Sequence, residues 1–246
     1  MVKRYGATKW IFSDLHGEML ELKTYEKYVK NIEGLTDDSP LAIYDSDFIN
    51  VDKSLINEYS MPKCFSYDLF NVINDDDERP PYRWILIGPE RSGTGMHIDP
   101  LYTNAWVTVL QGKKRWMLFP PMTPSKDIGM INDDDNGLEI SSNSIPSIIW
   151  FKEYYKKVTS KDWPTCYKPI EVLQHPGETV FIPQGWKHVV LNLELTLAVT
   201  HNYISEYSNL KWVWDDVQEN EPSLGQLWRE KMSLVRPDLV DKYFNT

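Results

Sequence analysis

The sequence predicts a mainly β protein, an antiparallel sandwich or barrel with helices at both ends. Short segments rich in β-branched and aromatic residues recur along the chain and are separated by turn residues, a pattern typical of such folds. The connections between them are too short for a succession of βαβ units. The 246 residues suffice for one hydrophobic core and no linker interrupts them, so we expect a single domain over residues 1–246.

The N-terminal part, about residues 1–35, is predicted to be helical before the strands begin. Within residues 18–32, apolar side chains recur every three to four positions and would form one face of a helix: Leu22, Tyr25, Val29 and Ile32. The barrel is expected over about residues 40–204. Its strands are predicted at residues 41–45, 82–88, 95–99, 105–112, 114–120, 170–174, 178–183, 188–193 and 196–204.

Two further helical regions are predicted. Residues 147–158 place Ile148, Phe151, Tyr155 and Val158 on one stripe, and C-terminal helices are expected over about residues 205–246. In the C-terminal region, Pro222 and Pro237 stand where new helices can begin. Its large apolar side chains must cover the barrel or meet a partner: Trp212, Trp214, Leu224, Leu227, Trp228 and Leu234. Because a barrel's own strands fill its core, we expect a homodimer through these helices, with packing on the same chain as the alternative.

The charge balance indicates which classes of partner are favoured. The net charge is −10 and no basic stripe is visible, so nucleic acid is not favoured as a partner, whereas basic protein segments would be attracted. No apolar run approaches the length of a membrane span, and the N-terminus has no signal-peptide pattern. Only two cysteines are present, which does not support a disulfide framework. We therefore expect an intracellular protein with no membrane partner, with nucleus and cytoplasm both open.

Three residues have the types and spacing of a metal site. His97 and Asp99 are two positions apart in a predicted strand, so both side chains would point to one face. His188 follows a Gln-Gly-Trp turn and opens another predicted strand. Two histidines and one carboxylate on one face of a metal form the facial triad of non-haem iron(II) oxygenases. The alternative is a set of unrelated core or surface histidines.

Lys114 is a candidate for binding an anion. It shares strand parity with Trp116 and Leu118, so its side chain would point inward. A buried lysine needs an anionic partner, and no acidic residue stands nearby in sequence. A bound carboxylate would meet that need, whereas a solvent-facing lysine on an edge strand would not require one.

At these positions the sequence resembles the Jumonji-C family of iron(II)- and 2-oxoglutarate-dependent oxygenases. Within that family it is most similar to the branch of protein lysyl-hydroxylases and reputed arginine demethylases. The resemblance is carried by RPPYRWILIGPERSGTGMHIDPLYTNAWVTVLQGKKRWMLFPP, DDSPLAIYDSDF and KPIEVLQHPGETVFIPQGWKHVVLNLELTLAVTHNY, and it covers roughly residues 18–204. It implies a double-stranded β-helix, a jelly-roll type of barrel.

The resemblance assigns roles position by position. It makes His97, Asp99 and His188 the iron ligands and catalytic centre, and Lys114 the partner of the distal carboxylate of 2-oxoglutarate. Thr94 and Thr200 match positions whose hydroxyls help to hold this cosubstrate, and Asn192 and Asn202 match asparagines behind it. Three positions depart from the branch: Ala42 replaces a Tyr, Val107 an Asn and Lys187 a Trp. Tyr44, two residues beyond Ala42, is positioned to supply a hydroxyl instead.

The resemblance also implies a reaction. Iron(II), dioxygen and 2-oxoglutarate would together hydroxylate a C–H bond, with release of succinate and carbon dioxide. The expected substrate is a lysine in a basic protein or peptide, or a methylated side chain that loses its methyl group after hydroxylation. The alternatives are a tRNA or nucleoside hydroxylase of the same family, a catalytically weak binding module with this fold, and a cupin-like protein that uses zinc or manganese. Relatives that dimerise through C-terminal helices give the homodimer a precedent.

Overall fold

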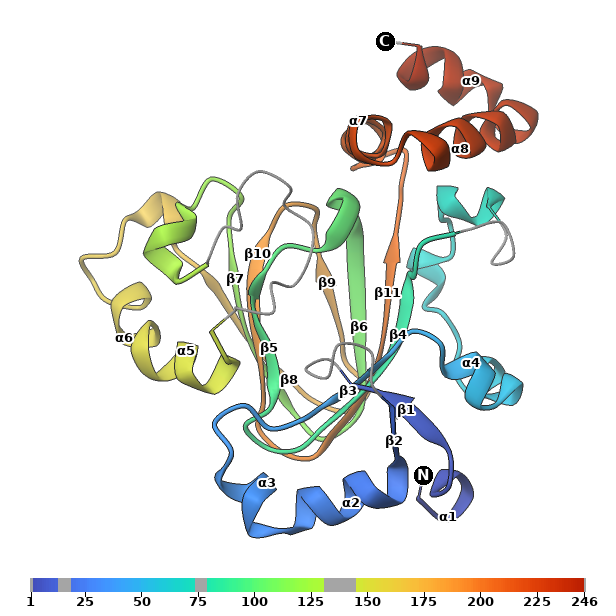
Figure 1. The fold of residues 1–246 in the computed structure, drawn as a ribbon. Coiled ribbons are helices and arrows are strands. Elements are labelled where there is room, and N and C mark those ends of the chain that lie inside the picture. Colours follow the sequence, from blue (N-terminus) through green and yellow to red (C-terminus); the bar gives the residue numbers. More distant parts are fainter. Residues whose placement is uncertain (1, 13–18, 74–78, 131–144, 246) are drawn as a thin grey trace.

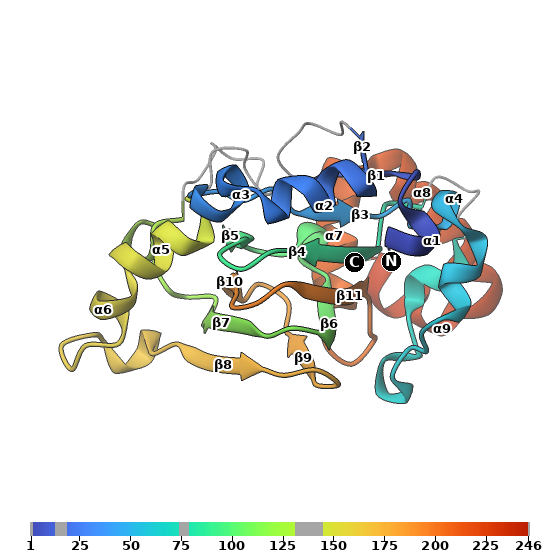
Figure 2. The same cartoon turned by 90° about the horizontal axis from the view of Figure 1, so that it is seen from below.

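Two antiparallel sheets face each other and form the barrel of the computed structural model, which describes residues 2–12, 19–73, 79–130 and 145–245 (Figures 1 and 2). The four-stranded sheet has the order β5 (Gly93–His97), β10 (Lys187–Asn192), β7 (Lys114–Phe119) and β8 (Ile170–Gln174). The five-stranded sheet has the order β3 (Ile43–Asp45), β4 (Arg83–Gly88), β11 (Thr196–Tyr203), β6 (Asn104–Gln111) and β9 (Thr179–Ile182). This arrangement confirms the predicted double-stranded β-helix.

Strand alternation divides the apolar side chains between the interior and the two outer faces. On β7, Trp116 and Leu118 point inward and pack with Val107 and Ile182 of the opposite sheet. The intervening Met117 and Phe119 point outward. The outer face of each sheet therefore has its own apolar cluster, and a third cluster between the two sheets fills part of the interior of the barrel.

Helices cover both outer faces. The four-stranded sheet is covered by α5 (Ser147–Glu153) and α6 (Tyr155–Val158), which contribute Trp150, Phe151 and Val158 to the cluster around Met117 and Phe119. The five-stranded sheet is covered by α2 (Leu22–Lys30), α4 (Phe48–Val51) and the small sheet β1 (Lys9–Ile11) with β2 (Met19–Glu21). The remaining N-terminal helices are α1 (Val2–Tyr5) and α3 (Ile32–Thr36). None of the described helices is both long and apolar enough to cross a membrane.

The hairpin between β6 and β7 fixes which side chains of β7 enter the barrel. Its turn contains Gly112, whose φ of 79° lies in the left-handed region, and a Cβ there would lie 2.4 Å from the carbonyl oxygen of Leu195. Beyond this turn Lys114 is buried, while Arg115 points outward and pairs with Glu171. Lys114 therefore faces inward, as its strand parity predicted.

Three sequence predictions need correction. The helix predicted from residue 18 begins at Leu22, because Met19–Glu21 pairs as a strand with Lys9–Ile11 and helps to cover the fully buried Trp10; residue 18 lies outside the described residues. The helix predicted over residues 147–158 divides at Tyr154 into α5 and α6. The strand predicted over residues 95–99 spans 93–97, so Asp99 stands just beyond its end.

The C-terminal helices form a core of their own at one end of the sheets (Figure 1). They are α7 (Leu210–Asn220), α8 (Pro222–Val235), α9 (Pro237–Leu239) and the π-helical turn Val240–Phe244, so Pro222 and Pro237 do begin helices. Trp214 and Trp228 are buried against the 3-10 helix Leu69–Val72 and Ile204, and Trp214 stacks on Phe244 with ring centroids 4.0 Å apart. Four of the six side chains expected to need cover therefore pack within the same chain, namely Trp214, Leu224, Leu227 and Trp228. Trp212 and Leu234 remain exposed.

Candidate functional site

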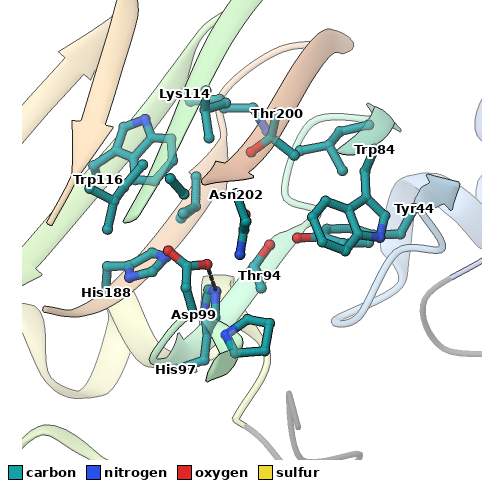
Figure 3. Close-up of a pocket in the computed structure, with 16 residues that line it drawn as sticks. Tyr44, Trp84, Thr94, His97, Asp99, Lys114, Trp116, His188, Thr200 and Asn202 are labelled. Carbon is teal, nitrogen blue, oxygen red and sulfur yellow. Dashed lines mark ion pairs between the residues drawn. The ribbon is translucent and has the colours of Figure 1, made fainter. Parts of the chain in front are cut away.

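His97, Asp99 and His188 converge at one end of the barrel interior (Figure 3). His97 is the last residue of β5, and its direct partner across the antiparallel pair is His188 on β10. The centroids of the two imidazole rings are 4.1 Å apart, and the potential ligand atoms of all three side chains lie within 4.8 Å of one another. Among the described residues, this is the group of His, Cys, Asp and Glu side chains that is arranged to hold a metal ion.

Backbone carbonyl groups orient both imidazoles. Nδ1 of His97 lies 2.8 Å from the carbonyl oxygen of Gly95, and Nδ1 of His188 lies 3.0 Å from that of Trp186. Since a carbonyl oxygen only accepts, each Nδ1 must carry the hydrogen. This tautomer leaves Nε2 of both rings available as a ligand atom, which is the usual arrangement around a metal-bound histidine.

The protonation states also suit a cation. Burial lowers the pKa of His188 to about 4, and burial together with the neighbouring His188 lowers that of His97 to about 4. Burial raises the pKa of Asp99 to about 6. At neutral pH the cluster is therefore two neutral imidazoles and a mainly ionised carboxylate.

One polar atom at this site has no partner in the part of the chain that the structure describes. Oδ2 of Asp99 is buried without a hydrogen bond, and Oδ1 reaches only Nε2 of His97, at 3.9 Å. An uncompensated buried carboxylate is costly, and a divalent cation would compensate it. Two nitrogens and one oxygen on one face are the donor set that non-haem iron(II) uses, so the residues present fit that metal.

The other end of the same cavity holds a buried cation (Figure 3). The side chain of Lys114 is almost wholly buried, and its Nζ donates to Oδ1 of Asn192 at 2.8 Å. Burial lowers the pKa of Lys114 to about 8, so the ammonium form still predominates at neutral pH. No salt bridge among the described residues involves Lys114, so its positive charge is available to an anionic ligand.

The cavity between these ends has the size of a small-molecule site. Its volume is about 340 Å³. Indole rings and aliphatic side chains form most of its wall, and they limit the access of water to the metal-binding residues. The lining residues are Tyr44, Trp84, Leu86, Thr94, His97, Asp99, Pro100, Ala105, Val107, Lys114, Trp116, Ile182, His188, Val190, Thr200 and Asn202.

The family to which the sequence matches agrees with the geometry of the site. The family description "JmjC domain, hydroxylase" matches residues 84–203, which include all three candidate ligands and Lys114. The chain belongs to the JmjC family.

Several curated proteins are similar to the chain over most of its length. It is 45% identical over 224 residues to a Caenorhabditis elegans protein named bifunctional arginine demethylase and lysyl-hydroxylase psr-1. The aligned region covers 90% of this chain and 54% of that protein. It is 41% identical over 185 residues to the arginine-specific demethylase JMJ22 of Arabidopsis thaliana, and the aligned region covers 75% of this chain and 35% of JMJ22. It is 28% identical over 232 residues to the mouse 2-oxoglutarate and iron-dependent oxygenase JMJD4, and the aligned region covers 87% of this chain and 49% of JMJD4. The chain thus spans about half the length of the Caenorhabditis relative.

Most of the residues expected to contact the cosubstrate line the cavity of this JmjC domain. Those that do so are Tyr44 on β3, Thr94 on β5, and Thr200 and Asn202 on β11. Asn192, which the resemblance placed behind the cosubstrate, does not line the cavity, and its amide oxygen accepts from Lys114. The hydroxyl of Thr200 donates to the carbonyl oxygen of Trp106 at 3.0 Å, so its hydrogen must turn before it can meet a carboxylate.

The three departures from the branch occupy different environments. Val107 lines the cavity and makes that part of the wall apolar, whereas Ala42 is absent from the lining and Tyr44 is present. Lys187 is buried beside His188 but its Nζ donates to the carbonyl oxygen of Pro121, away from the cavity. These differences leave the three candidate metal ligands and Lys114 in place.

Sequence reasoning missed two tryptophans in the wall. Trp116 stacks near His188, with ring centroids 6.0 Å apart, and Trp84 lies near Tyr44 at 6.2 Å. Trp116 shares strand parity with Lys114, so that signal was present in the sequence. Trp84 shares parity with Leu86 on β4, but parity alone does not tell which face of β4 is inward.

Proposed function

We propose that this chain is an iron(II)- and 2-oxoglutarate-dependent oxygenase that hydroxylates a side chain of a protein substrate. The observation that carries the proposal is one cavity with two distinct ends. One end holds a cluster of two histidines and one carboxylate, and the other holds a buried lysine that forms no ion pair with the described residues. A dicarboxylate such as 2-oxoglutarate has a metal-chelating end and a distal carboxylate, and both ends of the cavity match it. A zinc or manganese protein without this cosubstrate would leave Lys114 without a role.

Each residue has a distinct task in this mechanism. Nε2 of His97, Nε2 of His188 and the carboxylate of Asp99 would hold the iron, and the carbonyl groups of Gly95 and Trp186 keep the rings in place. The iron, when bound with 2-oxoglutarate and dioxygen, supplies the oxidising power that inserts oxygen into a C–H bond. The ammonium of Lys114 would anchor the distal carboxylate, and the indoles of Trp84 and Trp116 exclude water from the space between.

For the substrate we propose a lysine in a basic protein segment. The net charge of −10 would attract such a segment, and the Caenorhabditis relatives carry lysyl-hydroxylase in their names. The same names include arginine demethylase, which would use the same hydroxylation chemistry on a methyl group. A tRNA base is the rival within this chemistry, and the acidic surface disfavours it.

The test is a turnover assay of the full chain. With iron(II), ascorbate and 2-oxoglutarate present, basic peptides are expected to stimulate succinate formation, and mass spectrometry should find one added oxygen on lysine or one lost methyl group on methylated arginine. The Lys114→Ala variant serves as the inactive comparison and tRNA as the competing substrate. Stimulation by tRNA alone would replace the protein substrate, and an absence of succinate formation with and without substrate would refute the oxygenase assignment.

We further propose that the C-terminal helices join two copies of the chain. Trp212 on α7 and Leu234 on α8 are exposed by 59% and 83%, so their apolar surface is available to a partner chain. A twofold interface would bury both residues twice. Light scattering at micromolar concentration should give the dimer mass, and the Trp212→Ser, Leu234→Ser double variant should give the monomer mass. A monomeric parent chain would contradict the proposal.

A further inference from the structure

A chain of three hydrogen bonds runs from Lys114 back to the main chain. Nζ of Lys114 donates to Oδ1 of Asn192 at 2.8 Å, and Nδ2 of Asn192 donates to Oγ of Ser92, also at 2.8 Å. The hydroxyl of Ser92 then donates to the carbonyl oxygen of Pro89 at 2.6 Å. The side chains of all three linked residues are buried, so water does not compete for these bonds.

The backbone end of this chain dictates its direction. The carbonyl oxygen of Pro89 can only accept, so the single hydroxyl hydrogen of Ser92 points to it. Toward Asn192, Oγ of Ser92 can therefore act only as an acceptor. The amide of Asn192 must therefore turn its Nδ2 toward Ser92 and its Oδ1 toward Lys114. In the opposite orientation, Nδ2 would face the ammonium, two donors would oppose each other, and Lys114 would lose its acceptor.

An amide is chemically suited to this position. It gives the ammonium an acceptor but no negative charge, whereas a carboxylate would neutralise Lys114 and remove its attraction for an anion. The ammonium has three N–H donors and the amide takes one of them. The remaining donors are available to a carboxylate in the cavity.

The surrounding backbone leaves room for this network and holds it together. Gly88 ends β4, and a Cβ there would lie 2.4 Å from Oγ of Ser92 and 2.6 Å from Nδ2 of Asn192. The amide N–H of Asn192 donates to the carbonyl oxygen of Ser92, and the amide N–H of Arg91 donates to that of Asn192. These backbone bonds keep the turn beside β10 even when the Ser92 hydroxyl is removed.

We propose that Ser92 is a positioning residue for anion binding: it fixes the amide of Asn192 so that Lys114 keeps an uncharged acceptor and presents its ammonium to the ligand. The proposal rests on the proposed function only in naming 2-oxoglutarate as that ligand. Ser92 itself does not line the cavity, so it acts through Asn192 rather than on the ligand.

The other titratable groups around Lys114 are placed so that its titration can be followed separately. Those that share the cavity are Tyr44, His97, Asp99 and His188, and the candidate metal ligands among them lie at the opposite end (Figure 3). On the strands packed against β7, Glu171 of β8 pairs with Arg115 on the outer face, and Lys187 of β10 donates to Pro121. A change confined to Ser92 is therefore expected to affect Lys114 and to spare the metal end.

The first measurement uses no metal and no cosubstrate. In the full chain with carbon-13-labelled lysine, NMR gives the pKa of Lys114, whose signal is identified by its loss in Lys114→Arg. We expect Ser92→Ala to lower this pKa by about half a unit to one unit, because the acceptor of a charged hydrogen bond is no longer held in place. Asn192→Leu, which lacks the acceptor, sets the full size of the effect, and Ser147→Ala serves as a control at another buried serine. An unchanged pKa in Ser92→Ala would overturn the proposal.

The second measurement is calorimetric titration of 2-oxoglutarate into the manganese(II)-loaded chain, in which no turnover occurs. Ser92→Ala should weaken the affinity for 2-oxoglutarate by about three- to tenfold, because the ammonium of Lys114 is less well held. Gly88→Ala should have an effect of the same size, because the added Cβ displaces the amide of Asn192 and the hydroxyl of Ser92. Manganese affinity should be unchanged; a parallel loss of metal binding would mean a general structural role and would overturn the proposal. If the parent chain itself fails to bind 2-oxoglutarate, the proposed function falls, while the NMR titration still decides the role of Ser92.

Discussion

The two ends of the cavity are built from contacts of very different reach along the sequence. At the metal end, each histidine donates to a carbonyl group only two residues before it, and Asp99 follows His97 by two positions. At the anion end, Lys114 and Asn192 are 78 residues apart, and Asn192 and Ser92 are 100 apart. Local backbone geometry thus orients each metal ligand, although His97 and His188 meet only when β5 pairs with β10. At the anion end, every contact of Lys114 and Asn192 described above depends on long-range pairing within the four-stranded sheet.

The two ends also differ in the charge that burial leaves behind. Burial keeps both histidines neutral, so the metal end carries the single negative charge of Asp99 at neutral pH. The anion end carries the single positive charge of Lys114. Among the described residues, neither end has a charged partner of opposite sign, and each is therefore expected to gain stability from the matching ligand.

Removing Asp99 should break the metal end and give the largest effect. The Asp99→Ala variant is expected to lose iron(II) binding, measured by metal analysis after dialysis, because the only charged ligand is gone. Its metal-free stability should not fall, since the variant also removes a buried carboxylate oxygen without a partner. Asp215→Ala, at an exposed aspartate, is the control. Stoichiometric iron in Asp99→Ala would contradict the assignment of the ligands.

Removing Lys114 should break the anion end while sparing the metal end. Leaving one partner of a buried charge pair unpaired costs about 3–5 kcal/mol, so Lys114→Ala should weaken 2-oxoglutarate binding by about two orders of magnitude or more. Calorimetry on the manganese(II)-loaded chain measures this loss, and metal affinity should remain that of the parent chain.

The neighbouring lysine supplies a matched control for this prediction. Lys113 is partly exposed and pairs with Glu194 outside the cavity, so Lys113→Ala should leave the affinity for 2-oxoglutarate unchanged. Equal losses in the two variants would mean that the effect is one of overall charge and not of the buried site.

A buried histidine on the other side of β11 sharpens the comparison, because it does not line the cavity. His201 stacks on Trp106, with ring centroids 4.6 Å apart, and shares a hydrogen bond with the hydroxyl of Tyr59. Burial, reinforced by Arg83 and Arg79, lowers its pKa to about 3. The unfolded chain therefore takes up a proton below about pH 6.5 that the folded chain refuses, and the stability from neutral His201 is lost progressively as the pH falls from about 6.5 toward 3.

The size of this smallest effect follows from the same shift. Between pH 6.5 and pH 5, His201 should account for about 2 kcal/mol of the decrease in the free energy of unfolding. Urea unfolding at the two pH values should show a correspondingly smaller decrease in His201→Gln, while the exposed His175→Gln should behave as the parent chain does. Equal decreases in His201→Gln and the parent would show that the folded chain protonates His201 readily.

The same difference in reach explains what the sequence could predict. The spacing of His97 and Asp99 predicted a shared position even though the strand ends at His97, because Asp99 stays in an extended conformation and keeps its side chain beside the imidazole. Parity on β7 predicted that Lys114 points inward. The resemblance placed Asn192 behind the cosubstrate, but the sequence did not show that its amide would support Lys114. Ser92 gave no signal, because its contact with Asn192 joins residues 100 positions apart.

Local patterns failed where distant pairing decided the structure. Residues 19–21 continue a helical pattern, yet they form a strand because Leu20 pairs with Trp10. In the C-terminal helices, six large apolar side chains predicted a need for cover, but the sequence did not reveal that the helix Leu69–Val72 supplies part of it. Helical spacing identifies a buried face, and only the tertiary arrangement identifies what buries it.

The turn at Gly112 restricts the changes that a lineage carrying this chain can inherit. Because β7 alternates between the cavity and the outer face, deleting or inserting one residue between Gln111 and Lys114 would exchange Lys114 for Arg115 inside the barrel. Substituting Gly112 is also disfavoured, since its left-handed backbone lies against Leu195. Changes in chain length are therefore expected to survive in other connections, and this hairpin should keep its length for as long as selection retains the anion site.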